Sequence, residues 1–159
     1  MEPSSVLTVL LAAALPIGEL RLSIPLAMYT FNMSWYVAFL ISLIGNILPV
    51  LILVPTLSGI THLIRKRPNP LQPLLNWWSH RVLTAFNGIF QKYGAIALVI
   101  IVAIPLPITG AWTGSLASSI FEVKPRIAIP LISIGLVISG IIVTILTTTG
   151  SRLGILIMN

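Results

Sequence analysis

The chain interrupts one apolar run at residues 15–21, which read LPIGELR, and another at residues 105–114, which read PLPITGAWTG. The same residues surround both interruptions at the same spacing. Ala, Leu-Pro-Ile and Leu-Ile-Ser at positions 12, 15–17 and 40–42 recur 91 residues later, at 103, 106–108 and 131–133. In each copy a long uninterrupted apolar run follows the break. In a membrane protein this pattern indicates an internal repeat built around broken helices, which is typical of translocation sites.

The composition is that of an integral membrane protein. Of 159 residues, 57% are hydrophobic and 8% are charged, whereas soluble domains carry about 25% charged residues. So little charge cannot cover a soluble surface of this size, and the mean hydropathy of +1.06 agrees. We therefore expect a single all-α membrane domain over residues 1–159, and not a mostly buried soluble subunit.

The same composition disfavours several function classes. The chain has no cysteine, which rules out disulfides and thiolate metal sites. Its three acidic residues and two histidines, His62 and His80, are dispersed, so we expect no metal, no cofactor and no enzymatic activity. Most of the net charge of +6 lies in one short connecting segment. Membrane orientation explains that charge better than nucleic-acid binding does.

Two apolar segments, 35–57 and 127–149, are long enough to cross a membrane as helices. A span needs about 20 residues, and neither segment contains a charge. Pro49 and Pro55 predict a kink in the first span. Asn46 lies in the middle of that span, where we expect it to hydrogen bond to another helix.

The stretches 5–31 and 94–121 are also apolar, but each is divided into arms too short to cross a bilayer alone. Each is therefore either one broken span or a re-entrant hairpin, which enters and leaves the membrane on the same side. The basic residues favour hairpins, because seven of the nine then lie on one side, in agreement with the positive-inside rule. These seven are Arg65, Lys66, Arg67, Arg81, Lys92, Lys124 and Arg126.

This topology predicts an inverted repeat in the inner or plasma membrane. The expected elements are repeat 1 over 5–57 (hairpin 5–31, span 35–57), a basic loop with an amphipathic helix over 58–93, and repeat 2 over 94–149 (hairpin 94–121, span 127–149). The 65–93 loop would be cytoplasmic, and both termini would lie outside. Two spans and two hairpins enclose little volume, so a homodimer also fits.

Apolar residues at helical spacing predict a helix over 71–90 with an apolar and a polar face. The apolar face comprises Leu71, Leu74, Leu75, Trp78, Val82, Phe86 and Ile89. With Trp77 and Arg81, the segment resembles an amphipathic helix that lies in the cytoplasmic membrane interface. The alternative is an ordinary connecting helix docked on the bundle.

Glu19 and Arg21 are the only charged residues that interrupt an apolar stretch. A charge at mid-membrane costs about 2.5–3.5 kcal/mol on insertion scales, so such groups usually pair, or face water or a substrate. We therefore predict Glu19 as a proton carrier and Arg21 as a contact for an anionic head group. The alternative is an intramembrane ion pair that fixes the tip of the hairpin.

The second interruption carries no charge. Its chemistry is exposed backbone, the hydroxyls of Thr109 and Thr113, and the indole N–H of Trp112. These three residues are further candidates for binding a substrate or anion, because a helix beginning near Gly110 would point its positive end at the same place. The alternative is that the glycines serve packing alone and that Trp112 is an interface anchor. The predicted helix breaks of both stretches are Pro16, Gly18, Pro25, Pro105, Pro107, Gly110 and Gly114.

The two interruptions resemble the signatures of a known family. Residues 16–21 (PIGELR) with 24–27 (IPLA), and 105–107 (PLP) with 109–114 (TGAWTG), look like those of the small multidrug export protein family. That family is in turn similar to the DedA/VTT superfamily. The resemblance covers nearly the whole chain. It implies two re-entrant hairpins packed tip to tip, each followed by a spanning helix.

The resemblance also implies transport. Relatives in the wider superfamily move phospholipids or polyprenyl-phosphate carriers between leaflets, some of them with proton coupling. Glu19 matches an acidic position of the first hairpin and Arg21 its basic neighbour. DedA proteins place arginines in the second hairpin, where this chain has Thr109, Trp112 and Thr113, so a clamp of several arginines around a phosphate is not expected here.

Two functions therefore compete. The first is a transporter that moves a small amphiphilic or lipid substrate through a polar crevice between the hairpins, with proton coupling at Glu19. The second is a non-transporting membrane scaffold or lipid-binding protein, whose basic loop and amphipathic helix recruit partners or anionic lipid. Both functions involve membrane lipids, and neither involves nucleic acid.

Overall fold

The structure is a computed structural model that describes residues 2–66, 70, 72–105 and 109–158, without the side chains of 65–66, 74–75 and 151–158. The described residues form helices joined by turns, and no strand occurs among them. In chain order the elements are α1 (Pro3–Ala14), α2 (Glu19–Pro25), the π-helix η1 (Leu26–Thr30), α3 (Trp35–Lys66), α4 (Gln72–Tyr93), the 3-10 helix η2 (Gly94–Ile96), α5 (Ala97–Ala103), α6 (Ala111–Ile120) and α7 (Pro125–Met158).

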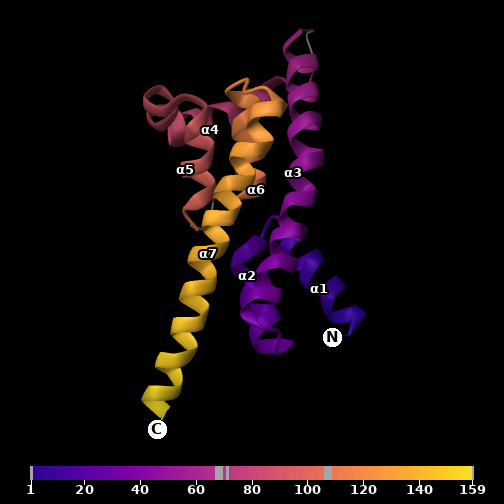
Figure 1. The fold of residues 1–159 in the computed structure, drawn as a ribbon. Helices are drawn as coiled ribbons and strands as arrows, with labels where there is room; N and C mark the ends of the chain where they lie inside the picture. The colour runs from indigo at the N-terminus through magenta and orange to yellow at the C-terminus, as the bar shows by residue number, and fades with distance from the viewer. Residues whose placement is uncertain (1, 67–69, 71, 106–108, 159) are drawn as a thin grey trace.

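Two long helices, α3 and α7, frame the molecule, and two short helix pairs lie between their ends (Figure 1). The α1–α2 pair occupies the lower half of the view, where α1 rises to the middle and α2 returns downward. The α5–α6 pair occupies the upper half, where α5 descends to the middle and α6 returns upward. The two pairs therefore turn back near the same level from opposite ends.

Three stretches of the described chain are long and apolar enough to cross a membrane: Trp35–Ile64, Asn76–Ala103 and Pro125–Gly150. The first and last have 30 and 26 residues, and at about 1.5 Å per residue each exceeds the roughly 30 Å of a hydrocarbon core. These two stretches contain the predicted spans 35–57 and 127–149. Pro49 and Pro55 do not end α3, which continues through them as one helix.

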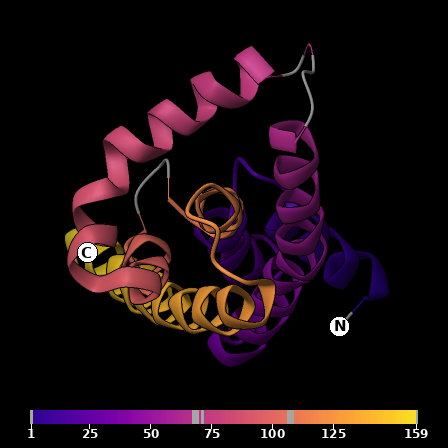
Figure 2. The ribbon, with the colours of Figure 1, turned by 90° about the horizontal axis from the view of Figure 1, so that it is seen from above.

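The middle stretch, Asn76–Ala103, changes direction. It comprises most of α4, then η2, then α5, and Gly94 at the turn has φ 56°. Figure 2, seen from above, shows α4 lying in the plane of the view while α5 is seen nearly end-on. The turn explains why a run of sufficient hydropathy does not form one straight helix here.

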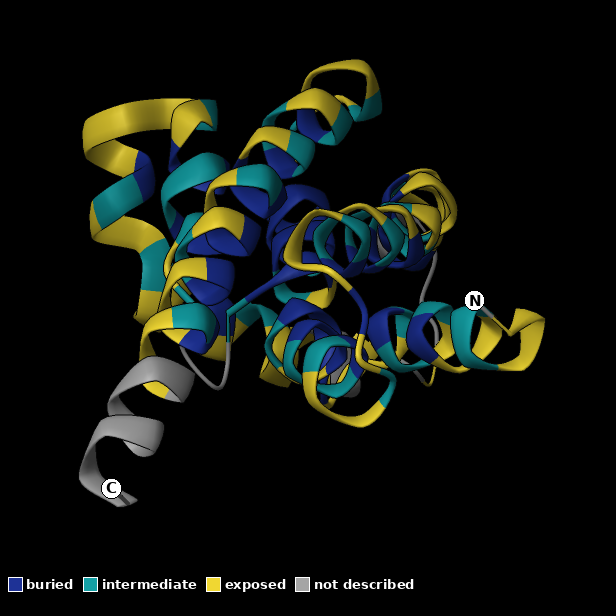
Figure 3. Cartoon of the chain, turned by 60° about the horizontal axis from the view of Figure 1, so that its bottom comes forward, coloured by how far each residue is buried: buried dark blue, intermediate teal, exposed yellow. Residues whose placement is uncertain are grey.

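The outer faces of the helices are apolar. Ile52, Leu63 and Leu146 are 66%, 71% and 63% exposed, and Figure 3 shows exposed residues along the outward sides of the helices. Exposed apolar surface on this scale is not found on soluble monomers and marks contact with lipid or another protein. The buried polar positions lie inside the bundle instead.

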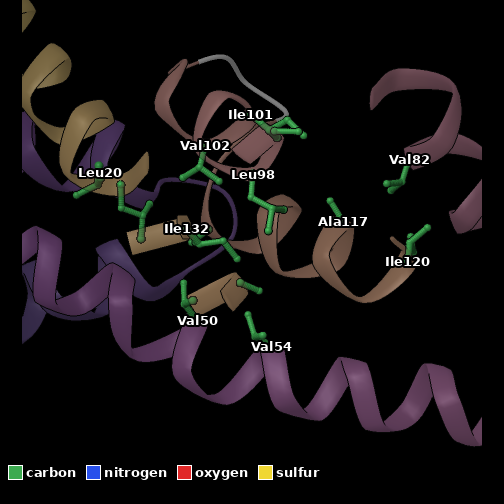
Figure 4. Close-up of a cluster of buried hydrophobic side chains, with 14 of the residues drawn as sticks. Leu20, Val50, Val54, Val82, Leu98, Ile101, Val102, Ala117, Ile120 and Ile132 are labelled. Carbon is green, nitrogen blue, oxygen red and sulfur yellow. The ribbon is translucent and has the colours of Figure 1, made fainter. Parts of the chain in front are cut away.

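Helix α6 is the central element, with α3, α4, α5 and α7 around it in Figure 2. Small side chains allow this enclosure, and seven of its ten residues are buried. A Cβ added to Gly114 would lie 2.6 Å from Val102 of α5, so the glycine sets how closely the two helices approach. Around them lies the main core, which includes Leu20, Val50, Val54, Leu98, Ile101 and Ile132 (Figure 4).

The helix predicted over 71–90 is present as α4 (Gln72–Tyr93), and it docks on the bundle. Val82 is buried, and Phe86 and Ile89 pack against the main core. The Phe90 ring stacks on Phe121 with 3.6 Å between centroids. Trp77 and Trp78 remain 52% and 45% exposed. The C-terminal half of α4 is therefore docked on the bundle, as in the alternative given above, while its two tryptophans stay partly exposed. The position of α4 in the membrane interface remains a prediction.

Candidate functional site

The first tip is the turn between α1 and α2, residues 15–19. Leu15 is extended where α1 ends, and Pro16 and Gly18 lie in the turn, as predicted for helix breaks. Glu19 begins α2 with φ 47°, a left-handed conformation that costs a non-glycine residue about 1–2 kcal/mol. The surrounding contacts therefore hold Glu19 in a conformation it would not adopt alone.

Glu19 caps the N-terminus of α6. Its carboxylate accepts hydrogen bonds from the backbone N–H of Ala111 at 3.2 Å and of Trp112 at 3.3 Å, the first two residues of α6. Only 6% of Glu19 is exposed. A buried carboxylate is tolerated when hydrogen bonds and a helix N-terminus stabilise its charge, and both conditions are met here.

Gly110 makes this contact possible. It precedes α6 with φ 154° and ψ −158°, a combination that is essentially restricted to glycine. A Cβ at this position would coincide with the Glu19 carboxylate. The glycine predicted as a helix break thus also provides the space in which the carboxylate reaches the N–H groups of α6.

Two further hydrogen bonds join the tips. The Arg21 guanidinium donates to the backbone carbonyl of Thr109, and the Trp112 indole Nε1 donates to the carbonyl of Ala14 at 3.1 Å. We call Glu19, Arg21, Thr109, Ala111 and Trp112 the tip contact. It brings together Glu19, the predicted proton carrier, and three of the four candidate binding residues named from sequence, which are Arg21, Thr109 and Trp112.

Glu19 and Arg21 form no salt bridge with one another in the described part of the chain. Each side chain contacts the second tip instead. The tips are therefore held together by hydrogen bonds between residues that are 88 to 98 positions apart, and not by the ion pair weighed as the alternative. Thr109 also donates through its hydroxyl to the carbonyl of Ile104 at 2.5 Å, which closes the second tip on itself.

A crevice lies on each side of the tip contact. One, of about 300 Å³, adjoins α2 and the lower half of α7, and the other, of about 260 Å³, adjoins α3, α4 and α6. The first is lined by Arg21, Pro25, Pro105, Val143, Leu146 and Thr147. The second is lined by Leu53, Leu57, Trp78, Trp112, Thr113 and Leu116. Of the predicted binding residues, Arg21 thus lines one crevice and Trp112 and Thr113 line the other, whereas Thr109 and the buried Glu19 line neither.

Three buried polar side chains lie on α2, which begins with Glu19, and on α3, which packs against it. Asn46 of α3, 0% exposed, comes close enough to act on the carboxylate, yet neither amide atom makes a hydrogen bond. The interaction expected for Asn46 across helices is therefore made with the Glu19 carboxylate of α2, but outside the distance and angle of a well-formed hydrogen bond. Ser23 and Ser42 are also fully buried and unbonded. Sequence reasoning missed both serines, although Ser42 and Asn46 stand one helical turn apart in an apolar span.

The remaining predicted breaks have mixed outcomes. Pro25 lies at the end of α2, and the π-helix η1 follows it. Pro105 lies in the turn after α5, whereas Pro107 falls outside the described residues. Gly114 does not break α6 but packs it against Val102. No group of three or more potential metal ligands occurs among the residues that the structure describes.

Comparison with known proteins identifies one family. The model of the family described as "Putative small multi-drug export protein" matches residues 19–142, more than half of the chain. No curated protein and no solved structure matches the chain. The matched range begins at Glu19 and contains the whole tip contact, while α1 lies before it. The further resemblance to the DedA/VTT superfamily remains a prediction.

Proposed function

Since this chain belongs to the small multi-drug export protein family, we propose that it is a membrane transporter that moves an amphiphilic or lipid-like substrate past the tip contact. The observation that carries the proposal is the position of that contact between two crevices. A transporter requires a substrate pathway that is closed at one level and open on either side of it. In this proposal the tip contact is the gate that closes the pathway between the two crevices.

The proposed topology has both helix pairs as re-entrant hairpins. The α1–α2 pair would enter from the side of the termini and the α5–α6 pair from the opposite side, so that the two repeats have opposite orientation. The basic residues support this, because Lys92, Lys124 and Arg126 then share the cytoplasmic side with the 65–67 segment. Backbone that is not helical at membrane depth is tolerated where it is buried in protein or lines a water-filled cavity. Gly18 and Gly110 at the two tips are buried, whereas Leu15 and Ile17 of the first tip are exposed.

Glu19 is the proposed coupling residue. Hydrogen bonds to an ionised carboxylate are about twice as strong as those to a neutral group, and the positive end of α6 favours the ionised form. Protonation would therefore weaken the bonds from Ala111 and Trp112 and loosen the tip contact. Deprotonation would restore it. The proton would thus control whether the two crevices communicate.

Arg21 is the proposed head-group contact. Its side chain reaches the lower crevice while one guanidinium nitrogen binds the Thr109 carbonyl, so its other donors are placed to bind an anion. A larger apolar groove of about 410 Å³, between the start of α3 and the lower half of α7, would hold the tail of an amphiphile. This groove is lined by Trp35, Phe39, Ile141, Thr144, Ile145, Thr148 and Thr149.

A flux assay tests the proposal. The protein is reconstituted into liposomes that contain a fluorescent lipid or a cationic dye, with and without a pH gradient. We expect faster movement than in protein-free vesicles, and we expect Glu19→Gln and Arg21→Ala each to reduce it about tenfold or more. The matched controls Glu122→Gln and Arg126→Ala, which alter exposed charges away from the tip contact, should retain it.

The same variants separate transport from the scaffold function. If neither probe moves faster than in empty vesicles under any gradient, transport fails. If in cells Glu19→Gln and Arg21→Ala are silent while charge reversal of Arg65, Lys66 and Arg67 abolishes function, the scaffold is favoured. Cysteine-accessibility mapping tests the hairpins, because Lys124→Cys and Arg67→Cys should label from the same side. Labelling from opposite sides contradicts them.

A further inference from the structure

Three buried polar side chains on α2 and α3 have no protein partner within hydrogen-bond distance and angle. Ser23, Ser42 and Asn46 are each 0% exposed, and the hydroxyl oxygens, the amide nitrogen and the amide oxygen are all unbonded. An unsatisfied buried polar group costs about 1–3 kcal/mol, so several in one place call for an explanation by water or an ion. Elsewhere in the described chain, buried hydroxyls such as those of Ser115 and Ser118 bond to backbone carbonyls.

Glu19 and the three polar residues form two successive pairs across α2 and α3. Glu19 and Ser23 are one turn apart on α2, and Ser42 and Asn46 are one turn apart on α3. The two helices run in opposite directions (Figure 1) and pack together, and Asn46 lies beside Glu19. Ser23 therefore falls opposite Ser42, one turn nearer the end of the molecule that carries the termini. Ala27 and Ala38 pack in one cluster at the next step and close that end.

The donors and acceptors of Ser23, Ser42 and Asn46 indicate which molecule or ion lies between them. A cation would satisfy the amide oxygen of Asn46 but would leave its amide nitrogen, a donor, without a partner. Water donates and accepts, so it satisfies both amide atoms and both serine hydroxyls. We propose that Ser23, Ser42 and Asn46 hold ordered water between α2 and α3, and that this water relays protons to and from Glu19.

The relay follows from ordinary proton chemistry. A water hydrogen-bonded to the Glu19 carboxylate gives it a proton and takes one from the next water, so no bond other than O–H forms or breaks. Arg21 is the charged group that acts on Glu19, and the other side chains beside the carboxylate are neutral. The water site stands independently of the proposed function, whereas the relay rests on Glu19 being the coupling residue.

Water-edited solid-state NMR tests the site without any transport measurement. The full chain is labelled with ¹⁵N-asparagine in phosphatidylethanolamine–phosphatidylglycerol vesicles, and the Asn46 amide signal is assigned by its loss in Asn46→Leu. We expect transfer from water to Asn46 at a rate similar to that of exposed Asn32. Transfer about tenfold slower than at Asn32 would mean a dry site and would overturn the proposal.

Serine variants sharpen the test. Ser23→Ala with Ser42→Ala removes two of the groups that hold the water, and we expect transfer to Asn46 to fall about threefold or more. Ser118→Ala is the matched control, because it removes an equally buried hydroxyl that is already bonded to Ser115. An equal fall in both variants would indicate general loosening of the bundle and would count against the site. The unmodified protein still decides the question if a variant does not fold.

Infrared spectroscopy tests the relay. The carboxyl band of protonated Glu19, identified by its loss in Glu19→Gln, shifts when H₂O is replaced by D₂O. We expect Asn46→Leu to slow this exchange about tenfold and Ser118→Ala to leave it unchanged. Equal exchange in Asn46→Leu overturns the relay. A Glu19 carboxyl that never protonates while Asn46 still contacts water refutes the coupling role of Glu19 and leaves the water site standing.

Discussion

The two tips that meet in the centre of this protein have opposite chemistry. The first carries two charged side chains, Glu19 and Arg21, whereas the second offers backbone N–H groups and a carbonyl. The charged groups of the first tip bond to backbone groups of the second: Glu19 caps α6, and Arg21 binds the carbonyl of Thr109. Both tips contain the sequence Leu-Pro-Ile, at 15–17 and at 106–108. They nevertheless contribute different groups to the site. The difference explains why the second tip needs no charge of its own.

The largest effect on the contact between the two tips is expected for a substitution of Gly110. In Gly110→Ala the new Cβ would collide with the Glu19 carboxylate and would occupy a glycine-only conformation, so we expect a loss of about 4 kcal/mol in the free energy of unfolding. Unfolding by SDS in mixed micelles measures it. Gly59→Ala, where the added Cβ meets open space, is the control. Loss of equal size in both variants would contradict the account.

A second pair of variants compares how the two helix pairs pack. A Cβ on Gly45 would lie 2.7 Å from the Leu10 carbonyl oxygen of α1, and one on Gly135 would lie 2.7 Å from Val102 of α5. We expect Gly45→Ala and Gly135→Ala to cost about 2–3 kcal/mol each. The same SDS titration, with Gly88→Ala as control, measures both. A large loss in one variant alone would show that the long helices do not hold the two pairs alike.

Glu19→Gln isolates the charge of the first tip. The amide keeps the size of the side chain but has one acceptor oxygen for two N–H donors and no charge, so we expect a loss of about 2 kcal/mol. The loss should appear at neutral pH and shrink in acid, where the wild-type carboxyl is also neutral. Unfolding at several pH values measures this, with exposed Glu2→Gln as control. A loss that does not change with pH would argue that the carboxyl is already protonated.

The smallest effect is expected at Trp112. Trp112→Phe keeps an aromatic ring but removes the hydrogen bond from the indole to the Ala14 carbonyl, which is worth about 1 kcal/mol. Trp77→Phe, at a ring that is 52% exposed and lines neither crevice nor the groove, is the matched control. If Trp112→Phe is neutral in both stability and flux, the indole bond does not contribute to holding the tips together.

Much of the fold follows from local sequence. The uncharged runs 35–57 and 127–149 lie within α3 and α7, and the Pro-Gly interruption at 16–18 coincides with the turn between α1 and α2. Helix length and hydropathy are properties of contiguous residues, which is why they could be predicted. The helix ends were less accurate, because α3 continues to Lys66 and because α7 begins at Pro125 and continues to Met158.

The candidate site was predictable in its residues but not in their partners. Charge beside a helix break singled out Glu19 and Arg21, and the sequence by itself determined that such charges in an apolar chain must find polar partners. Only the tertiary structure decided that the partners are the backbone groups of a segment some 90 residues away. Only it decided, too, that Ser23 and Ser42 are buried without hydrogen-bond partners on the two helices that carry Glu19 and Asn46. Such pairings depend on which helix faces meet, and that choice is made by the packing of small residues across the whole bundle.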